Sequence, residues 1–230
     1  MPDSNLRQLI DAAQLLRPLL HELVFVGGAV TGLLITDQAA GAPRTTFDVD
    51  AIAEITSYAQ YVEFGERLRT LGFVEDTSVG APVCRWVCQR TVLDVMPLEE
   101  NILGFSNRWY RAAMDTAVTQ RLAEDLEILM VTAPLFLATK IEAFKSRGKG
   151  DFSTSHDLED CISVVDGRAV IVEEIQATAL ELRAYVRTEI SALLGTPAFL
   201  DALPGYLFPD AMSQARIGII LRRLNALKAL

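Results

Sequence analysis

The segment from Phe25 to Asp50, FVGGAVTGLLITDQAAGAPRTTFDVD, constrains the fold of this chain more than any other. An apolar run, Leu23–Val26, precedes the pair Gly27-Gly28, and a helix-forming run follows it. That order predicts a strand, a tight turn and a helix. Glycines at such a turn let the backbone approach a phosphate closely, and the start of a helix favours negative charge. A glycine pair alone serves equally well for simple chain reversal.

The same segment ends on two carboxylates, Asp48 and Asp50. The surrounding TTFDVDAIAEI alternates as a strand does, so the two side chains project to the same side, about 6 to 7 Å apart along the strand. Carboxylate oxygens are hard ligands suited to Mg²⁺, and two ionised carboxylates this close need a cation or a solvated edge. For an isolated D-x-D, a solvated strand end is the commoner interpretation.

Two further features favour a metal site over a solvated strand end. Arg44 and Thr46, in the preceding PRTT, supply a cation and a hydroxyl beside the aspartates. Asp94 is a single carboxylate in the apolar strand-like run TVLDVMP, and a buried Asp is rare unless it is paired or binds a ligand. A hydrogen-bonded structural role for Asp94 is the alternative. We therefore predict that Asp48, Asp50 and Asp94 hold a metal ion.

Composition excludes several classes of protein. A formal net charge of −9 argues against a broad basic surface that coats nucleic acid, although a local basic pocket is compatible with it. Four strand residues span about 13 Å, so Cys84 and Cys88 are too far apart to pair on a strand, and with two histidines in the chain a structural zinc site is not expected. An odd number of cysteines and an N-terminus unlike a leader predict a cytoplasmic protein, and no stretch resembles a membrane span.

The pattern along the chain predicts an α+β fold. We expect an α/β core over residues 1–125, with a mixed or antiparallel sheet and flanking helices, and a helical region over residues 126–230 that completes the active-site cleft. The last three strands of the core should form an antiparallel meander. The expected helices include 3–20, 29–35, 58–71, 132–147 and 170–194, and the expected strands are 23–26, 45–55, 73–79, 81–90 and 91–98.

The glycine pair, RTTFDVD and the later lone Asp94 together resemble the nucleotidyltransferase superfamily of polymerase-β-like enzymes, and especially the AbiEii-type toxin nucleotidyltransferases. Members share a GG or GS turn, a D-x-D pair, a third strand carboxylate, a downstream Lys and a D-L helix. The stretch LATKIEAFKSRGKGDFSTSHDLEDCI is similar to that later part, and the resemblance covers roughly Leu23 to Val165.

The later motif departs from the family pattern at one point. Lys140 and Arg147 match, but FSTS appears inserted where the family runs more directly from its Arg-Asp to the Asp-Leu. Both Asp151 and Asp157 are therefore candidates for the acidic residue of this motif.

The resemblance implies a Mg²⁺-dependent nucleotidyltransferase. Asp48, Asp50 and Asp94 would hold two Mg²⁺ ions, and an acceptor hydroxyl would attack the α-phosphorus of a nucleoside triphosphate, with pyrophosphate leaving. Asp94 would bind the metal that activates the hydroxyl. An ordinary solvated position on an amphipathic helix is the alternative for Lys140. The residues implied in nucleotide binding are Gly27, Gly28, Thr31, Arg44, Thr46 and Lys140.

The acceptor is less constrained. Toxin-like relatives imply a tRNA or other RNA end and an antitoxin protein as partner. Transfer to a small hydroxylated molecule such as an aminoglycoside is the alternative, favoured by the acidic composition, and a non-catalytic nucleotide-binding module is another. In NRWYR, Trp109 or Tyr110 beside arginine would suit stacking on RNA, but such a cluster is more often a packed helix with solvated arginines.

Overall fold

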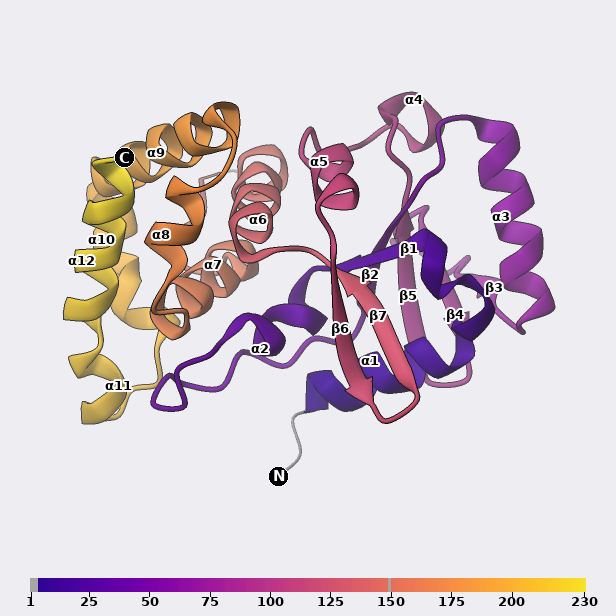
Figure 1. Ribbon diagram of the computed structural model, residues 1–230, viewed down its shortest axis with the longest axis horizontal. Coiled ribbons are helices and arrows are strands. Elements are labelled where there is room, and N and C mark those ends of the chain that lie inside the picture. The colour runs from indigo at the N-terminus through magenta and orange to yellow at the C-terminus, as the bar shows by residue number, and fades with distance from the viewer. Residues whose placement is uncertain (1–3, 149) are drawn as a thin grey trace. The chain divides into compact units, whose positions relative to one another are not determined.

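The computed structural model describes residues 4–148 and 150–230 and divides the chain into two compact units (Figure 1). The first, here called the sheet unit, comprises the described residues up to Gly32 and the segment Thr45–Thr132. The second, the helical unit, comprises Leu33–Arg44 and Ala133–Leu230. In the described part of the chain, no helix combines the length and the apolar character needed to cross a membrane.

A seven-stranded mixed sheet forms the centre of the sheet unit, in the order β3-β4-β5-β2-β1-β7-β6. The pairs β1/β7 and β2/β5 are parallel, and the other neighbours are antiparallel. The strands are β1 (Leu23–Val26), β2 (Val49–Ala53), β3 (Val74–Glu75), β4 (Arg85–Cys88), β5 (Thr91–Met96), β6 (Val118–Ala123) and β7 (Leu126–Met130).

Helix α1 packs across the sheet against β5, β2, β7 and β6, because Leu9, Ala12 and Ala13 are fully buried on one side of the helix. The unit also contains α3, which Ser57 caps by accepting a hydrogen bond from the backbone N–H of Gln60. The helices of this unit are α1 (Ser4–Leu15), η1 (Arg17–Glu22), η2 (Gly28–Val30), α3 (Tyr58–Thr70), α4 (Glu100–Leu103) and α5 (Tyr110–Asp115), and α2 (Thr31–Leu34) crosses the boundary between the units.

The two faces of the sheet differ in character around β4 and β5. Trp86 and Leu93 are paired across these strands and fully buried on one face, where Gly65 of α3 lets the Trp86 ring approach closely. The neighbouring pair, Arg85 and Asp94, points to the opposite face because side chains alternate along a strand. Arg85 and Asp94 therefore lie on the face of the sheet opposite the one that buries Trp86 and Leu93.

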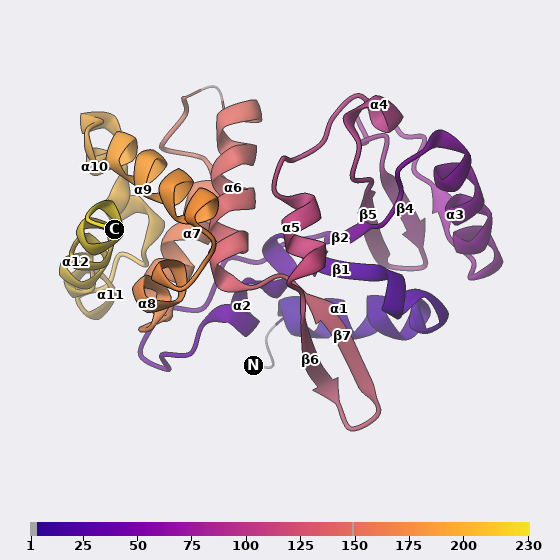
Figure 2. The ribbon, with the colours of Figure 1, turned by 45° about the horizontal axis from the view of Figure 1, so that its top comes forward.

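The helical unit is a bundle in which α6 packs against α7, α8 and α9, and α12 packs against α7, α8 and α9 (Figures 1 and 2). The Leu33–Arg44 segment is held to it by backbone N–H groups of Thr36 and Asp37, which both donate to the carbonyl of Gly167. Its helices are α6 (Ala133–Arg147), α7 (His156–Gly167), α8 (Ile171–Gln176), α9 (Leu180–Leu194), α10 (Pro197–Ala202), η3 (Leu203–Tyr206), α11 (Ala211–Ala215) and α12 (Ile217–Lys228).

The expected α+β class and the antiparallel meander of β3, β4 and β5 are confirmed. The expected helix over residues 58–71 and the helix ending before Gly148 are also confirmed. Cys84 and Cys88 are buried and free, as expected, and Cys161 is buried and free as well.

Several expectations differ from the structure. The helix expected over 3–20 is divided into α1 and η1, and the strand expected over 73–79 is reduced to the two residues of β3. The helix expected over 170–194 is broken into α8 and α9, since Thr178 donates its hydroxyl to the Ile175 carbonyl and Ala179 is extended. The strand expected over 45–55 begins only at Val49, so Asp48 lies just before it. The sheet also continues beyond residue 125 through the hairpin of β6 and β7, and the division between the units falls after Thr132.

Candidate functional site

The turn after β1 packs directly against Asp50. Gly27 has a φ of +71°, and a Cβ at this position would lie 1.8 Å from Oδ2 of Asp50. Only glycine combines this backbone conformation with so close an approach. The first glycine of the pair is therefore required by the carboxylate beside it, whatever else the turn binds.

Asp48, Asp50 and Asp94, here called the carboxylate cluster, lie on one side of two adjacent parallel strands. Asp50 on β2 is the direct cross-strand partner of Asp94 on β5, so their side chains share a face of the sheet. Asp48 is positioned by Thr46, whose hydroxyl donates to Oδ1 at 2.8 Å and whose backbone N–H donates to Asn5 on α1. The strand register thus brings Asp50 and Asp94 to one face, and the hydrogen bond from Thr46 orients Asp48 just before β2.

Arg85 on β4 links two members of the carboxylate cluster, and the sequence analysis did not identify it. Its Nε and Nη2 donate to the two oxygens of Asp94, each at 2.8 Å, and the same Nη2 donates to Oδ2 of Asp48 at 2.7 Å. The exposed fractions of the side chains are 23% for Arg85, 31% for Asp48 and 8% for Asp94. A bidentate charge-assisted pair is among the stronger hydrogen-bonded interactions in proteins.

The charges of the site shift the pKa values of two neighbouring side chains. Hydrogen bonding to Asp94, and the charges of Asp94 and Asp48, raise the pKa of the Arg85 guanidinium above its ordinary value. Burial, with Asp94 and Asp50 nearby, raises the pKa of the Cys84 thiol to about 12. Cys84 is therefore protonated at neutral pH and is no nucleophile.

The carboxylate oxygens of the cluster are the kind of ligand that a hard divalent cation binds. One guanidinium nitrogen, Nη2 of Arg85, donates hydrogen bonds to both Asp48 and Asp94, which shows that these carboxylates converge on a single positive charge. Within residues 4–148 and 150–230, however, no three His, Cys, Asp or Glu side chains are arranged to hold a metal ion together. Arg85 instead provides the positive charge beside Asp48 and Asp94.

Two other residues predicted to contact the nucleotide, Gly28 and Thr31, are buried. Gly28 is buried, and Thr31 is fully buried with an Oγ1 that has no hydrogen-bond partner among the residues described. Leaving a buried hydroxyl unpaired costs about 1 to 3 kcal/mol. A role for Thr31 in binding phosphate stays a prediction.

The helical unit contains a second set of charges, which we call the charge chain: Arg147, Asp157, Lys140, Asp160 and Arg44 in order of contact. Lys140 Nζ lies 2.6 Å from Asp160 and 3.3 Å from Asp157. Arg44 donates to both oxygens of Asp160, at 3.0 and 3.1 Å, and Arg147 donates to both oxygens of Asp157, at 2.9 and 2.8 Å. Lys140 is therefore buried and ion-paired, which contradicts the alternative of a solvated surface lysine.

The two acidic candidates of the later motif have different environments. Asp151 is exposed and accepts hydrogen bonds from the backbone N–H groups of Ser153 and Thr154, so it stabilises its own loop. Asp157 is buried on α7. Burial alone would raise the pKa of Asp157, but hydrogen bonds from Arg147 and the charge of Lys140 hold it below its ordinary value. Asp157, together with Asp160, is thus the acidic partner of Lys140.

The NRWYR stretch is a packed element. Trp109 is buried, with the guanidinium of Arg108 lying 5.1 Å from its ring centroid, and Arg111 pairs with Glu54 at 2.8 Å. A buried indole offers no open face for a base. The structure therefore favours the packed-helix interpretation of this stretch.

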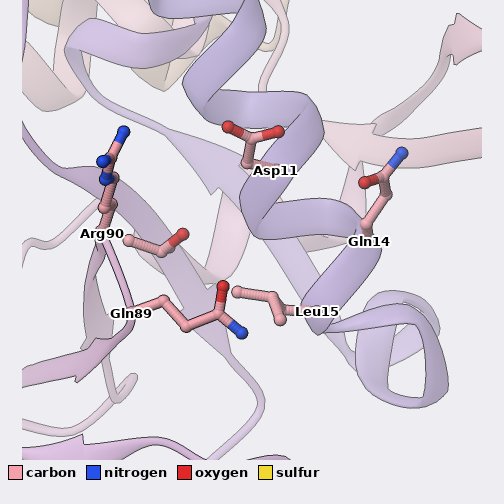
Figure 3. Close-up of a pocket in the computed structure, with 6 residues that line it drawn as sticks. Asp11, Gln14, Leu15, Gln89 and Arg90 are labelled. Atoms are coloured by element: carbon pink, nitrogen blue, oxygen red, sulfur yellow. The ribbon is translucent and has the colours of Figure 1, made fainter.

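A separate pocket of about 640 Å³ opens between α1 and the turn that joins β4 to β5 (Figure 3). It is lined by Asp11, Gln14, Leu15, Gln89, Arg90 and Thr91. In the described part of the chain, its lining includes none of the predicted site residues. The pocket is thus distinct from the carboxylate cluster.

Comparison with known proteins identifies the fold. No protein-family model matches the chain, and no curated protein matches it. Among solved structures, it is similar to an antigenic nucleotidyltransferase-like protein from Paracoccidioides brasiliensis, with a TM-score of 0.52 and 20% sequence identity over 88% of this chain and 93% of that one. The chain therefore has a nucleotidyltransferase-like fold, which confirms the expected fold class.

Proposed function

We propose that the protein is a Mg²⁺-dependent nucleotidyltransferase that transfers a nucleoside monophosphate from a nucleoside triphosphate to an acceptor hydroxyl. The observation that carries the proposal is the register of β2 and β5, which puts Asp50 beside Asp94 on one face, next to the Gly27 turn. The nucleotidyltransferase-like fold supports the same reaction class.

The proposal gives roles to the carboxylate cluster, to Thr46 and to the glycine turn. Asp48, Asp50 and Asp94 would hold the metal, and Thr46 would orient Asp48 through its hydroxyl. When bound, Mg²⁺ would stabilise the charge of the reacting phosphate and favour ionisation of the acceptor hydroxyl. The Gly27-Gly28 backbone would contact the triphosphate, since glycine leaves it uncovered by a Cβ.

The acceptor that we propose first is an RNA end, with tRNA as the first test, as in toxin-like nucleotidyltransferases; an antitoxin partner would follow from that assignment. The net charge of −9 favours a second candidate, a small cationic hydroxylated acceptor, because opposite charges attract the substrate to the protein. We also propose that the nucleotide contacts Lys140, Arg44 and Thr31.

One assay tests the chemistry and the acceptor together. The purified protein is incubated with Mg²⁺ and each α-labelled nucleoside triphosphate, in the presence of total tRNA or a panel of small hydroxylated molecules. We expect label to transfer to one acceptor class with release of pyrophosphate. Nucleotide that stays intact with every acceptor contradicts the proposal.

Substitutions then assign the activity to the site. Asp50→Asn and Asp94→Asn should each lower transfer about a hundredfold or more, since each removes a charge from the reacting centre. Asp125→Asn is the matched control, because Asp125 is an exposed aspartate of the same unit that pairs with Arg17. Near-normal transfer by Asp50→Asn would show that the carboxylate cluster does not perform the reaction.

A further inference from the structure

Arg85 is the charged residue of the site for which the proposed reaction has no use. Its guanidinium takes both oxygens of Asp94 and one oxygen of Asp48. These are the oxygens that a hard cation would bind, because carboxylates are its preferred protein ligands. A metal ion and the guanidinium therefore require the same atoms.

The guanidinium and a metal ion cannot both bind these oxygens without weakening each other's contacts. A divalent cation and a guanidinium about 4 Å apart repel each other even at a partly exposed site. A carboxylate oxygen that accepts a hydrogen bond from the guanidinium also has fewer lone pairs with which to bind the metal ion. Binding of a metal ion at Asp48 and Asp94 must therefore weaken the Arg85 contacts.

The geometry allows the Arg85 side chain to move without loss of the strand. Its backbone N–H donates to the Pro82 carbonyl, and its own carbonyl accepts from the backbone N–H of Asp76. These bonds hold the main chain of β4 independently of the guanidinium. The side chain is partly exposed, whereas Asp94 is nearly buried, so the guanidinium has solvent beside it into which it can turn.

We propose that Arg85 is an internal counter-ion that competes with a divalent cation for Asp48 and Asp94, and that it releases at least one of these carboxylates when the metal binds. The inference rests on the proposed function only for the identity of the metal ligands. It gives Arg85 two effects: it neutralises the carboxylates in the metal-free protein, and it weakens their affinity for the metal.

The first test measures binding of Mn²⁺ to the whole, nucleotide-free protein by calorimetry or by electron paramagnetic resonance. Arg85→Met should bind Mn²⁺ about tenfold more tightly than the wild type, which corresponds to about 1.4 kcal/mol. Arg121→Met is the matched control, since Arg121 is an exposed arginine of the same sheet that pairs with Glu127, and its affinity should stay within about twofold of the wild type.

Binding by Arg85→Met that is no tighter than that of the wild type overturns the proposal, and so does an equal gain in Arg121→Met. Adding Asp94→Asn to Arg85→Met should remove the gain in Mn²⁺ affinity, and this loss would assign the bound ion to the carboxylate cluster. Neither measurement contains nucleotide or acceptor. A gain in affinity without any nucleotidyl transfer would therefore refute the proposed function and leave this inference intact.

A second measurement on the wild type applies even if Arg85→Met fails to fold. The Nε–H of Arg85 donates to Asp94, so it should give a protected signal in proton–nitrogen correlation spectra, assigned by its absence in Arg85→Lys. Saturation with Mg²⁺ should shift this signal and speed its exchange with water. A signal unchanged by saturating Mg²⁺ overturns the proposal.

Discussion

Each unit of the molecule contains a cation shared by two aspartates, but the two arrangements differ in burial. Arg85 bridges Asp48 and Asp94 in the sheet unit, where Asp48 is 31% exposed. Lys140 bridges Asp157 and Asp160 in the helical unit, with exposed fractions of 8%, 9% and 1%. Water reaches the first bridge and is largely excluded from the second.

The balance of charge differs as well. The carboxylate cluster and Arg85 combine three carboxylates with one guanidinium, a formal charge of −2, whereas the charge chain combines three cations with two carboxylates, a formal charge of +1. An exposed excess of negative charge is suited to exchange one cation for another. A buried bridge is suited to holding helices together, because breaking it leaves a charge that neither water nor an opposite charge stabilises.

The largest effect that tests this comparison is expected from Asp160→Ala. Asp160 is the buried partner of both Arg44 and Lys140, so its loss removes the bidentate pair with Arg44 and leaves Asp157 as the one remaining carboxylate of the charge chain. We expect the free energy of unfolding to fall by about 3 to 5 kcal/mol, measured by urea denaturation. Asp151→Ala, at an exposed aspartate of the same unit, should cost about 1 kcal/mol or less. An equal loss in the two variants would contradict a structural role for the charge chain.

A smaller effect is expected from Gly27→Ala, which tests the close packing beside the carboxylate cluster. The positive φ and the contact with Asp50 both oppose a Cβ. Gly104→Ala is the matched control, since Gly104 has a φ of +80° with no atom within 4 Å of the added Cβ. The control should lose about 1 to 2 kcal/mol of unfolding free energy through backbone strain, and Gly27→Ala should lose at least about 1 kcal/mol more.

A double substitution identifies why Gly27→Ala should lose more unfolding free energy than Gly104→Ala. Asp50→Gly removes the three atoms that the new Cβ would meet, Oδ2 at 1.8 Å, Cγ at 2.6 Å and Cβ at 2.8 Å. In the Asp50→Gly background, Gly27→Ala should therefore cost nearly as little as the control, because the effects of substitutions at residues in contact are not additive. If Gly27→Ala still lost more unfolding free energy than the control in the double variant, the strain would lie elsewhere in the turn.

Much of the sheet could be predicted from local pattern. Leu23–Val26 is apolar and ends at a glycine pair, and β4 and β5 are rich in Val, Cys and Leu on either side of a polar turn. The hairpin of β6 and β7 was missed, although Leu126, Ile128 and Met130 alternate with less buried residues. Its first strand has few buried side chains, so hydrophobic periodicity marks it weakly.

The carboxylate cluster could be predicted because short spacings on strands determine which side chains share a face. Arg85 was accessible to the same reasoning: a two-residue turn at Gln89 and Arg90 pairs Cys88 with Thr91, and counting back three residues pairs Arg85 with Asp94. The link between Lys140 and Asp160 could not be obtained this way. It depends on how two helices pack, and helical periodicity predicts a buried face but not its partner.

The smallest effect is expected from Arg147→Met at the exposed end of the charge chain. Arg147 is 70% exposed, so the loss at pH 7 should be only about 0.5 to 1 kcal/mol. Because Arg147 holds the folded-state pKa of Asp157 below the unfolded value, its contribution is present above about pH 4 and is lost as the pH falls through the folded-state value. Urea unfolding at a series of pH values should therefore show the wild type and the variant converging below about pH 4. A difference that stays constant down to the acid transition would mean that Arg147 acts through packing of its aliphatic stem, and not through the charge of Asp157.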